Sequence, residues 1–461
     1  HTQIQHKQIT FHTVMSETQN TPTKSDESLG HSLINYAVKE LNLPPSNDFA
    51  KVFGQVKDLL TDVGMWPHQV EMVSLSPTKV KIGEEVKTLM SSYSYLCLGF
   101  DKSIIEAGEA AGRKYSSLPG TRVMCGTTEI HTQLEKAVAK FYGREDAVVY
   151  SSTYMANISV LTSLINKSDV IVADNFIHQS LRDGCTLTGA RFMRFRHAHM
   201  EQAEEILDNL RNKENYEGNI FFVVDSVYSM DGDILDLPTA RRLCDQYRAT
   251  LIVDECHALG VIGKTGRGVE EHFNMPGACD IITSCFSKSL ASTGGFVVGS
   301  KKMITLARFL GRGPIFSVPL CAYNCGQALR ALEILETTPS LVETLQSNSV
   351  YFKQELKKHG FDYGLSESAV VPLIVGQERK VMMLFKHLYE NGFFANVVTH
   401  PAVPLNKARL RLIMTVEHTK EDVDKFVSSL VEFENMYQMM EKYFNSKIKK
   451  QDGDQPVDEE L

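Results

Sequence analysis

Three short polar clusters each follow directly on an apolar run of the chain. VDSVYSMDGD contains Ser229, VDECHALG contains Asp254 and His257, and SCFSKS contains Lys288. The apolar runs before them have the length and composition of buried strands. Because ligands of a parallel sheet bind outside the carboxyl ends of its strands, we expect these four side chains to converge on one site.

An aspartate, a histidine and a lysine at one sheet edge suit a particular chemistry. A lysine that forms a Schiff base needs a partly desolvated pocket and a lowered pKa. A pyridinium cofactor needs a carboxylate at its ring nitrogen, donors at its phenolate oxygen and N–H groups of a helix start at its phosphate. The segment SSTYMANIS, where a strand leads through Ser and Thr into a helix, suits such a phosphate.

Each of these residues also has an ordinary structural interpretation. A lysine in a Ser-rich loop is usually a surface residue, and a lone Asp-x-x-His is usually a helix cap with a hydrogen-bonded histidine. For His131, in GTTEIHTQLE, we favour a core or interface role. Ordered clusters at three successive strand ends favour a functional site over coincidence.

The elements that must position these residues are seven strands and the helices between them. The expected strands span residues 147–150, 170–173, 192–195, 220–224, 250–253, 281–284 and 296–299. The runs do not alternate with polar residues, which is typical of strands covered on both faces. Helical patterns between them, such as 200–212 and 238–247, predict a mainly parallel sheet.

The fold class expected is therefore α/β, with a large, mainly parallel seven-stranded sheet domain and a smaller C-terminal α/β domain. The smaller domain should contain strands at 369–375 and 410–414 and helices at 380–391 and 420–437, after a long helix at 321–336. We expect this division: a disordered extension 1–31, a helix (32–63) and hairpin segment 32–100, the large domain 101–330, the small domain 331–445 and a charged tail 446–461.

Composition limits the functions open to this 461-residue chain. A net charge of −8 gives no basic surface for nucleic acid, and no apolar run is long enough to span a membrane. The nine cysteines show neither Cys-x-x-Cys nor zinc-ligand spacing, so we expect no metal site. Their odd number indicates reduced thiols and an intracellular location, most simply the cytoplasm; an organelle matrix or peripheral membrane association also fits.

From about residue 90 to about residue 433 the chain resembles the α-oxoamine synthases, which are pyridoxal 5'-phosphate enzymes of fold type I. The resemblance is carried, in chain order, by SYSYLCLGF, GTRVMCGTTEIHTQLE, YMAN, DNFIHQSLRDG, SVYSMDGDILDLP, VDECHALGVIGKTGRG, FSKSLASTGG, PIFSVPL and ARLRLIMTVEHTKEDVD. Such enzymes, serine palmitoyltransferase among them, condense an amino acid with an acyl-CoA and release carbon dioxide and CoA. The resemblance implies the same activity and cofactor here.

The resemblance also implies a role for individual residues at the cofactor. Lys288 would form the internal aldimine and later move the Cα proton, and Asp254 would pair with the pyridine nitrogen. His257 and Ser229 would bind the phenolic oxygen, and His178 would stack on the ring and touch the substrate carboxylate. The phosphate would be held by a set of groups near two chain segments: Thr153, Tyr154, Met155 and Ser287, and Ser317 from a neighbouring subunit.

Two further residues concern the substrate. Arg411, the second arginine of ARLRL, would bind the amino-acid carboxylate, for which a guanidinium fork is suited, and Arg409 would be structural. Tyr93 stands where many relatives have Asn, which resembles serine palmitoyltransferases and favours a role in sphingolipid biosynthesis. Cys285 stands where a phosphate-binding Thr is usual, so the phosphate contact is expected to be weaker unless Ser284 or Ser287 compensates.

Rival interpretations are left open by the sequence. The chain could be another fold-type-I enzyme acting on amino acids, such as an aldolase or aminotransferase. It could also be a non-catalytic partner subunit, although Lys288, Asp254 and His178 are all present. The acyl donor could be an acyl-CoA or a thioester-linked carrier protein. The resemblance implies a homodimer with active sites at the subunit interface.

Overall fold

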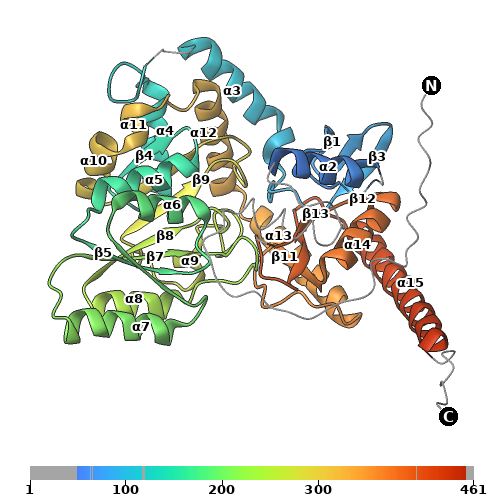
Figure 1. The fold of residues 1–461 in the computed structure, drawn as a ribbon. Helices are drawn as coiled ribbons and strands as arrows, with labels where there is room; N and C mark the ends of the chain where they lie inside the picture. The colour runs from blue at the N-terminus through green and yellow to red at the C-terminus, as the bar shows by residue number, and fades with distance from the viewer. Residues whose placement is uncertain (1–48, 63, 65, 117–119, 401, 453–461) are drawn as a thin grey trace.

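The computed structural model describes residues 49–62, 64, 66–116, 120–400 and 402–452 (Figure 1). The expected N-terminal extension, 1–31, lies outside the described residues, as does the first part of the helix expected over 32–63. The remainder of that helix is α2, Phe49–Asp62. The expected charged tail begins as a continuation of helix α15, Lys420–Asp452, and its residues 453–461 lie outside the described part.

A seven-stranded sheet forms the centre of the larger part of the molecule (Figure 1). In spatial order its strands are β4 (Asp146–Tyr150), β10 (Gly295–Gly299), β9 (Ile281–Cys285), β8 (Ala249–Asp254), β7 (Ile220–Asp225), β5 (Val170–Asp174) and β6 (Arg191–Phe195). Strand β10 is antiparallel to both neighbours, and the other pairs are parallel. The seven strands and the mainly parallel sheet that the sequence predicts are confirmed.

Helices cover both faces of this sheet, which is why its strands are apolar without alternation. Successive side chains of a strand point to opposite faces, so Val148 and Val149 enter different cores. The Val148 core includes helices α5, α6 and α10, and the Val149 core includes α4, α7, α8 and α12. The bounds are α4 Glu129–Phe141, α5 Thr153–Leu164, α6 Gln179–Thr188, α7 Met200–Asp208, α8 Leu237–Gln246, α10 Lys301–Leu310 and α12 Ala322–Thr337.

The smaller part contains two further sheets. The predicted hairpin is present as β2 (Lys79–Ile82) and β3 (Glu85–Leu89), which form a sheet with β1 (Val73–Ser76) and the C-terminal β12 (Phe393–Phe394). The second sheet has the order β11 (Val370–Gly376), β14 (Ala408–Ile413), β13 (Asn396–Val398). The N-terminal hairpin is therefore part of the same layer as C-terminal residues, because the chain returns to it after the large sheet.

Sequence reasoning missed one long helix of this part, α13 (Ser340–Lys358). Its buried positions, Val342, Leu345, Phe352 and Leu356, follow the spacing of a helix face, so the signal was present in the chain. The helix expected at 380–391 is confirmed as α14 (Glu378–Glu390). The helix expected at 420–437 is confirmed as α15, which continues to Asp452. The expected boundary between residues 330 and 331 lies inside α12.

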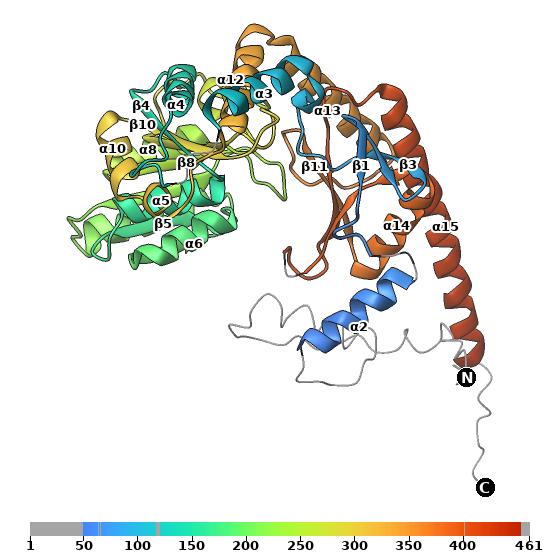
Figure 2. The same cartoon turned by 90° about the horizontal axis from the view of Figure 1, so that it is seen from above.

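The loop after β7 contacts strand β14 of the smaller part, and this part lies beside the large sheet in Figure 2. Arg409 of β14 donates to the carbonyl of Met230 at 2.9 Å and pairs with Asp231 at 2.7 Å, in keeping with its expected structural role. Gly232 has a φ of +76°, and a Cβ at this position would lie 2.1 Å from the carbonyl oxygen of Val370. These contacts fix β14, and with it Arg411, against the edge of the large sheet.

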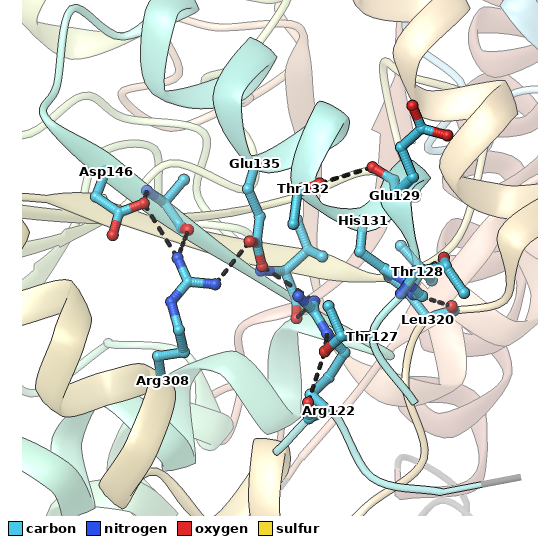
Figure 3. Close-up of polar contacts among 12 residues, drawn as sticks. Arg122, Thr127, Thr128, Glu129, His131, Thr132, Glu135, Asp146, Arg308 and Leu320 are labelled. Atoms are coloured by element: carbon cyan, nitrogen blue, oxygen red, sulfur yellow. Dashed lines mark hydrogen bonds and ion pairs between the residues drawn. The ribbon is translucent and has the colours of Figure 1, made fainter. Parts of the chain in front are cut away.

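A buried ionic cluster beside β4 joins α4 and α10, which cover opposite faces of the sheet (Figure 3). Both oxygens of the Glu135 carboxylate are used: Arg122 Nη1 lies 3.0 Å from Oε1, and Arg308 Nη1 lies 2.6 Å from Oε2. Arg308 also donates to the carbonyl of Ala147 at 2.6 Å and pairs with Asp146 at 3.1 Å. The Glu135 carboxylate thus joins two guanidinium groups that come from separate segments, and Asp146 supplies a second negative charge to Arg308.

His131 lies beside this cluster and is buried, as expected for a core or interface histidine (Figure 3). Its Nδ1 accepts the backbone N–H of Thr128 at 3.1 Å, so Nε2 carries the proton and donates to the carbonyl of Leu320 at 2.7 Å. The histidine therefore joins the start of α4 to the segment that precedes α12.

Removal of Glu135 should destabilise the fold strongly. We expect Glu135→Ala to lower the free energy of unfolding by about 3–5 kcal/mol, because the buried Arg122 loses its charged partner and Arg308 keeps only Asp146. Urea unfolding of the parent and the variant measures the difference. Glu129→Ala is the matched control, since Glu129 lies on the same helix but is exposed, and it should change little. Equal losses in the two variants would contradict the assignment.

His197 joins the loops at the carboxyl ends of β5 and β7. Its Nδ1 lies 3.0 Å from Asp174 and its Nε2 lies 2.9 Å from Asp233, while Phe176 stacks on the ring at 4.5 Å between centroids. Burial opposes the charged imidazole, but the two carboxylates outweigh it and raise the pKa of His197 to about 10. The loops that bear the site are therefore held by a cation.

This pair of contacts predicts a pH-dependent stability. The pKa of His197 is raised in the folded state above its unfolded value of about 6.5, so its contribution is complete below pH 6.5 and disappears as the pH rises through about 10. Thermal unfolding of the parent and His197→Gln at pH 6, 8 and 10 should show a difference in Tm that shrinks with pH. A difference that stays constant over this range would contradict the assignment.

Candidate active site

A cavity of about 210 Å³ lies at the carboxyl ends of β7, β8 and β9. Seven residues predicted from the sequence line it: Thr153, Tyr154, His178, Asp254, His257, Ser287 and Lys288. Four residues that sequence reasoning did not assign to the site line it as well: Ser180, Asp225, Val227 and Cys256. The convergence expected from the strand ends is therefore present for Asp254, His257 and Lys288.

Lys288 follows the end of β9 by three residues and is buried beside the cavity. Burial would lower the pKa of Lys288, as the sequence suggested, but the pKa is instead raised above its usual value by Cys285, Cys256 and further acidic neighbours. The Sγ of Cys285 lies 3.6 Å from the carbonyl oxygen of Cys256. Contact with Cys256, opposed by burial and aided by Lys288, lowers the pKa of Cys285 to about 6.

Asp254 at the end of β8 is buried and held by a donor on each oxygen. The backbone N–H of Cys256 donates to Oδ1 at 2.8 Å, and the side-chain amide of Asn157 donates to Oδ2 at 2.8 Å. A second carboxyl group, Asp225, lies in the same cavity and accepts the backbone N–H of His178 at 3.1 Å. Burial and the nearby Asp254 carboxyl raise the pKa of Asp225 well above its usual value, which favours the neutral form of Asp225.

His257 is oriented by a residue to which the sequence analysis gave no role. The Oη of Tyr95 lies 2.6 Å from Nδ1 of His257, and both side chains are buried. Burial raises the pKa of the Tyr95 hydroxyl, and burial together with the positive charge of Lys288 lowers the pKa of His257 well below its usual value. Both groups are therefore neutral, and the hydrogen bond between them fixes the orientation of the imidazole ring.

The start of α5 forms the anion-binding end of the site. The Oγ of Ser152 caps the helix by accepting the N–H of Met155 at 3.2 Å, while Thr153 and Tyr154 line the cavity. First-turn N–H groups and the helix dipole suit a phosphate here. A Cβ on Gly295 would lie 2.6 Å from the Cα of Thr153, so β10 can approach the helix start only with glycine at that position.

Arg411 and Tyr93 lie next to the cavity without lining it. Arg411 is only 2% exposed; its Nε donates to the carbonyl of Ser229 at 2.5 Å, and its Nη1 has no partner within the part of the chain that the structure describes. The ring of Tyr93 lies 4.7 Å from the guanidinium carbon of Arg411 and 5.9 Å from Nζ of Lys288. A buried guanidinium with a free N–H group is suited to an incoming carboxylate.

The remaining predicted residues are not brought to the cavity. Met155 lies in the first turn of α5 but does not line it, and Ser229 contributes its backbone carbonyl to Arg411. Ser317 lies at the end of helix α11 (Arg312–Phe316), also outside the cavity lining. The contacts expected of these three residues with a cofactor stay predictions.

The donor set fits pyridoxal phosphate group by group. A lysine amine is available for the aldehyde, a carboxylate for the ring nitrogen, the imidazole of His257 for the phenolic oxygen and a helix start for the phosphate. Among the described residues, no cluster of His, Cys, Asp and Glu is arranged to hold a metal ion, and none of the helices is long and apolar enough to cross a membrane.

Comparisons with known proteins agree with this chemistry. The family Aminotransferase class I and II matches residues 85–430. The 8-amino-7-oxononanoate synthase of Thermoanaerobacter pseudethanolicus is 37% identical over 349 residues, which are 76% of this chain and 87% of that one. A serine palmitoyltransferase of Bacteroides thetaiotaomicron is 36% identical over 369 residues, which are 80% of this chain and 93% of that one.

Solved structures give the same result. The serine palmitoyltransferase of Sphingomonas wittichii superposes with a TM-score of 0.80 at 30% identity, covering 85% of this chain and 98% of that one. A structure of serine palmitoyltransferase (SPT) with pyridoxal phosphate (PLP) as the internal aldimine has a TM-score of 0.78 at 30% identity. The match covers 84% of this chain and 99% of that one. The chain therefore belongs to the class I and II aminotransferase family and, within it, to the pyridoxal-phosphate-dependent α-oxoamine synthases.

Proposed function

We propose that this synthase condenses L-serine with a long-chain acyl thioester, releasing carbon dioxide and the thiol and forming an α-amino ketone. The observation that carries the amino-acid half of the proposal is the free Nη1 of Arg411, which is buried next to the ring of Tyr93 that Lys288 also faces. Two of the relatives named above are serine palmitoyltransferases, which supports serine as the first amino acid to test.

Each residue of the site has a distinct task in this reaction. When bound, pyridoxal phosphate supplies an electron sink for the Cα carbanion of the amino acid. Asp254 would hold the proton on the ring nitrogen, His257 would bind the phenolic oxygen, and Lys288 Nζ would remove and return the Cα proton. Arg411 binds the carboxylate, which fixes the orientation of the Cα–H bond before the proton is moved.

A second candidate is another fold-type-I activity on amino acids, such as an aldolase or aminotransferase. The matched family carries an aminotransferase name, so this alternative is tested alongside the first. The non-catalytic alternative is disfavoured because Lys288, Asp254 and His178 line one cavity, with Asn157 and Tyr95 supporting Asp254 and His257.

The deciding experiment measures release of CoA by the holoenzyme. A panel of serine, glycine and alanine is crossed with acetyl-CoA, palmitoyl-CoA and a palmitoyl carrier protein, and the amino ketone is identified by mass spectrometry. We expect release that requires both substrates and is fastest with serine and a long chain. A spectral response to amino acids without thiol release would favour the second candidate, and no response with any pair would contradict both.

A homodimer is part of the proposal. Phe316, Val318 and Met124 are 81%, 70% and 80% exposed, and the N–H of Val123 donates to the carbonyl of Pro314 at 3.2 Å, so these residues form one apolar surface. Together with α10, α11 lies at the end of the large part away from the smaller one (Figure 1). Ser317, between two of the exposed residues, would reach the phosphate of the partner subunit.

The dimer is tested by sedimentation. We expect the parent to sediment as a dimer and Phe316→Asp as a monomer, because a charge replaces an apolar side chain at the centre of the interface. The monomer should also bind pyridoxal phosphate more weakly, since Ser317 of the partner subunit is lost. Leu365→Asp, an equally exposed apolar residue of the smaller part, serves as the control and should stay dimeric. A monomeric parent would contradict the proposal.

A cytoplasmic location completes the proposal. The cysteines other than Cys125 are free thiols, which is typical of a reducing compartment. Fractionation of the native source with antibodies against the chain tests this location, and recovery in an organelle or membrane fraction would contradict it.

A further inference from the structure

Asn157 of α5 connects two residues of the active site. Its Nδ2 donates to Oδ2 of Asp254 at 2.8 Å and to Oγ of Ser180 at 2.9 Å. The side chain is fully buried, and its Oδ1 has no partner among the residues that the structure describes. An unpartnered buried oxygen destabilises a fold, so an amide retained here indicates that its two donated bonds matter.

The direction of the hydrogen bond from Asn157 to Ser180 determines how Ser180 contacts His178. Because the amide nitrogen can only donate, Ser180 Oγ accepts from it and its own hydrogen is directed to Nδ1 of His178, 2.7 Å away. The backbone N–H of Ser180 donates to the same Nδ1 at 3.2 Å. Burial lowers the pKa of His178, so the ring is neutral and its proton is on Nε2.

The bond to Asp254 acts on the charge of the carboxylate. The backbone N–H of Cys256 occupies Oδ1, so Asn157 is the donor that holds Oδ2. Asp225 lies in the same cavity and competes for negative charge with Asp254. Two donors on Asp254 favour its ionised form, and an ionised partner is what keeps a proton on a pyridine nitrogen rather than on the carboxyl group.

We propose that Asn157 is a positioning residue that keeps Asp254 ionised and correctly oriented for the ring nitrogen of the cofactor and, through Ser180, presents His178 as an Nε2–H donor. The inference rests on the proposed role of Asp254 at the ring nitrogen. It does not depend on which amino acid or acyl thioester is used.

The test observes the ring nitrogen directly. Holoenzyme is prepared with pyridoxal phosphate labelled with ¹⁵N at the ring, and the ¹⁵N chemical shift is followed from pH 6 to pH 10. In the parent we expect the protonated shift over most of this range. In Asn157→Leu, which has a similar shape and no donor, the ring nitrogen should lose its proton at a pH about one unit lower, a tenfold loss of proton affinity.

Two further variants separate this role from a structural one. Asn157→Ala also removes the donor without adding a charge, so it carries the same expectation should Asn157→Leu not fold. Ser159→Ala is the control on the same helix: it removes a buried hydrogen bond, to the N–H of Gly313 at 2.8 Å, away from Asp254. Its ring nitrogen should titrate as in the parent.

The possible results distinguish the proposals. A parent-like titration in folded Asn157→Leu or Asn157→Ala would overturn the role of Asn157 while leaving that of Asp254 intact. An unprotonated ring nitrogen in the parent at pH 6 would overturn both. A shifted titration in the variants supports the inference even if the thiol-release panel gives no product, in which case only the proposed reaction fails.

Discussion

Lys288→Ala should bind pyridoxal phosphate without a covalent bond and lose its turnover by at least about 10²–10⁴-fold, the range expected for removal of a proton-transferring group. Lys288 and Asp254 line the same cavity, so the amine of Lys288 is available to a cofactor that pairs with Asp254. The variant loses both the covalent anchor of the cofactor and the group that moves the Cα proton. Borohydride reduction followed by intact-mass measurement, with steady-state turnover, measures both effects.

Ser289→Ala provides the comparison for this experiment. Ser289 is the next residue, is buried and donates to the carbonyl of Leu259 at 2.6 Å, so its loss perturbs the same turn without touching the amine. It should retain the reducible adduct. An adduct of undiminished yield in Lys288→Ala, formed at another lysine, would show that the anchor has been assigned to the wrong residue.

Arg411→Ala should raise the KM for the amino acid by about 30- to 4,000-fold, which corresponds to the 2–5 kcal/mol that loss of one partner of a buried charge pair costs. Nη1 of Arg411 has no partner in the described structure, so it can donate to the incoming carboxylate. Arg411→Lys should recover only part of the loss, because a single ammonium replaces a two-pronged donor. Initial rates over a range of amino-acid concentrations measure the effect.

Arg409→Ala is the matched control for this second prediction. Arg409 lies on the same strand, is buried to a similar extent, and is bound to Met230 and Asp231. Its loss should lower the thermal stability and leave the amino-acid KM near that of the parent. Equal rises of KM in Arg409→Ala and Arg411→Ala would show that β14 acts only through its packing.

The sequence alone determined the large sheet and the residues at its strand ends. Strands buried on both faces give continuous apolar runs, and this local signal located the strands of the sheet other than β6. Strand β6 is a partly exposed edge strand that contains two arginines, and it was recognised from the short run 192–195. Because the polar clusters follow β8 and β9 directly, the sheet itself brings Asp254, His257 and Lys288 together. Such positions need no knowledge of how distant segments pack.

What only the tertiary structure decided are the contacts between residues far apart in the chain. Tyr95 meets His257 across 162 positions, and Asn157 meets Asp254 across 97. Asn157 is a buried polar residue inside a helix and Tyr95 lies in a turn, so neither carries a periodic signal that identifies its partner. Arg411 reaches the site because the loop after β7 binds β14, and this depends on the packing of the smaller part against the sheet.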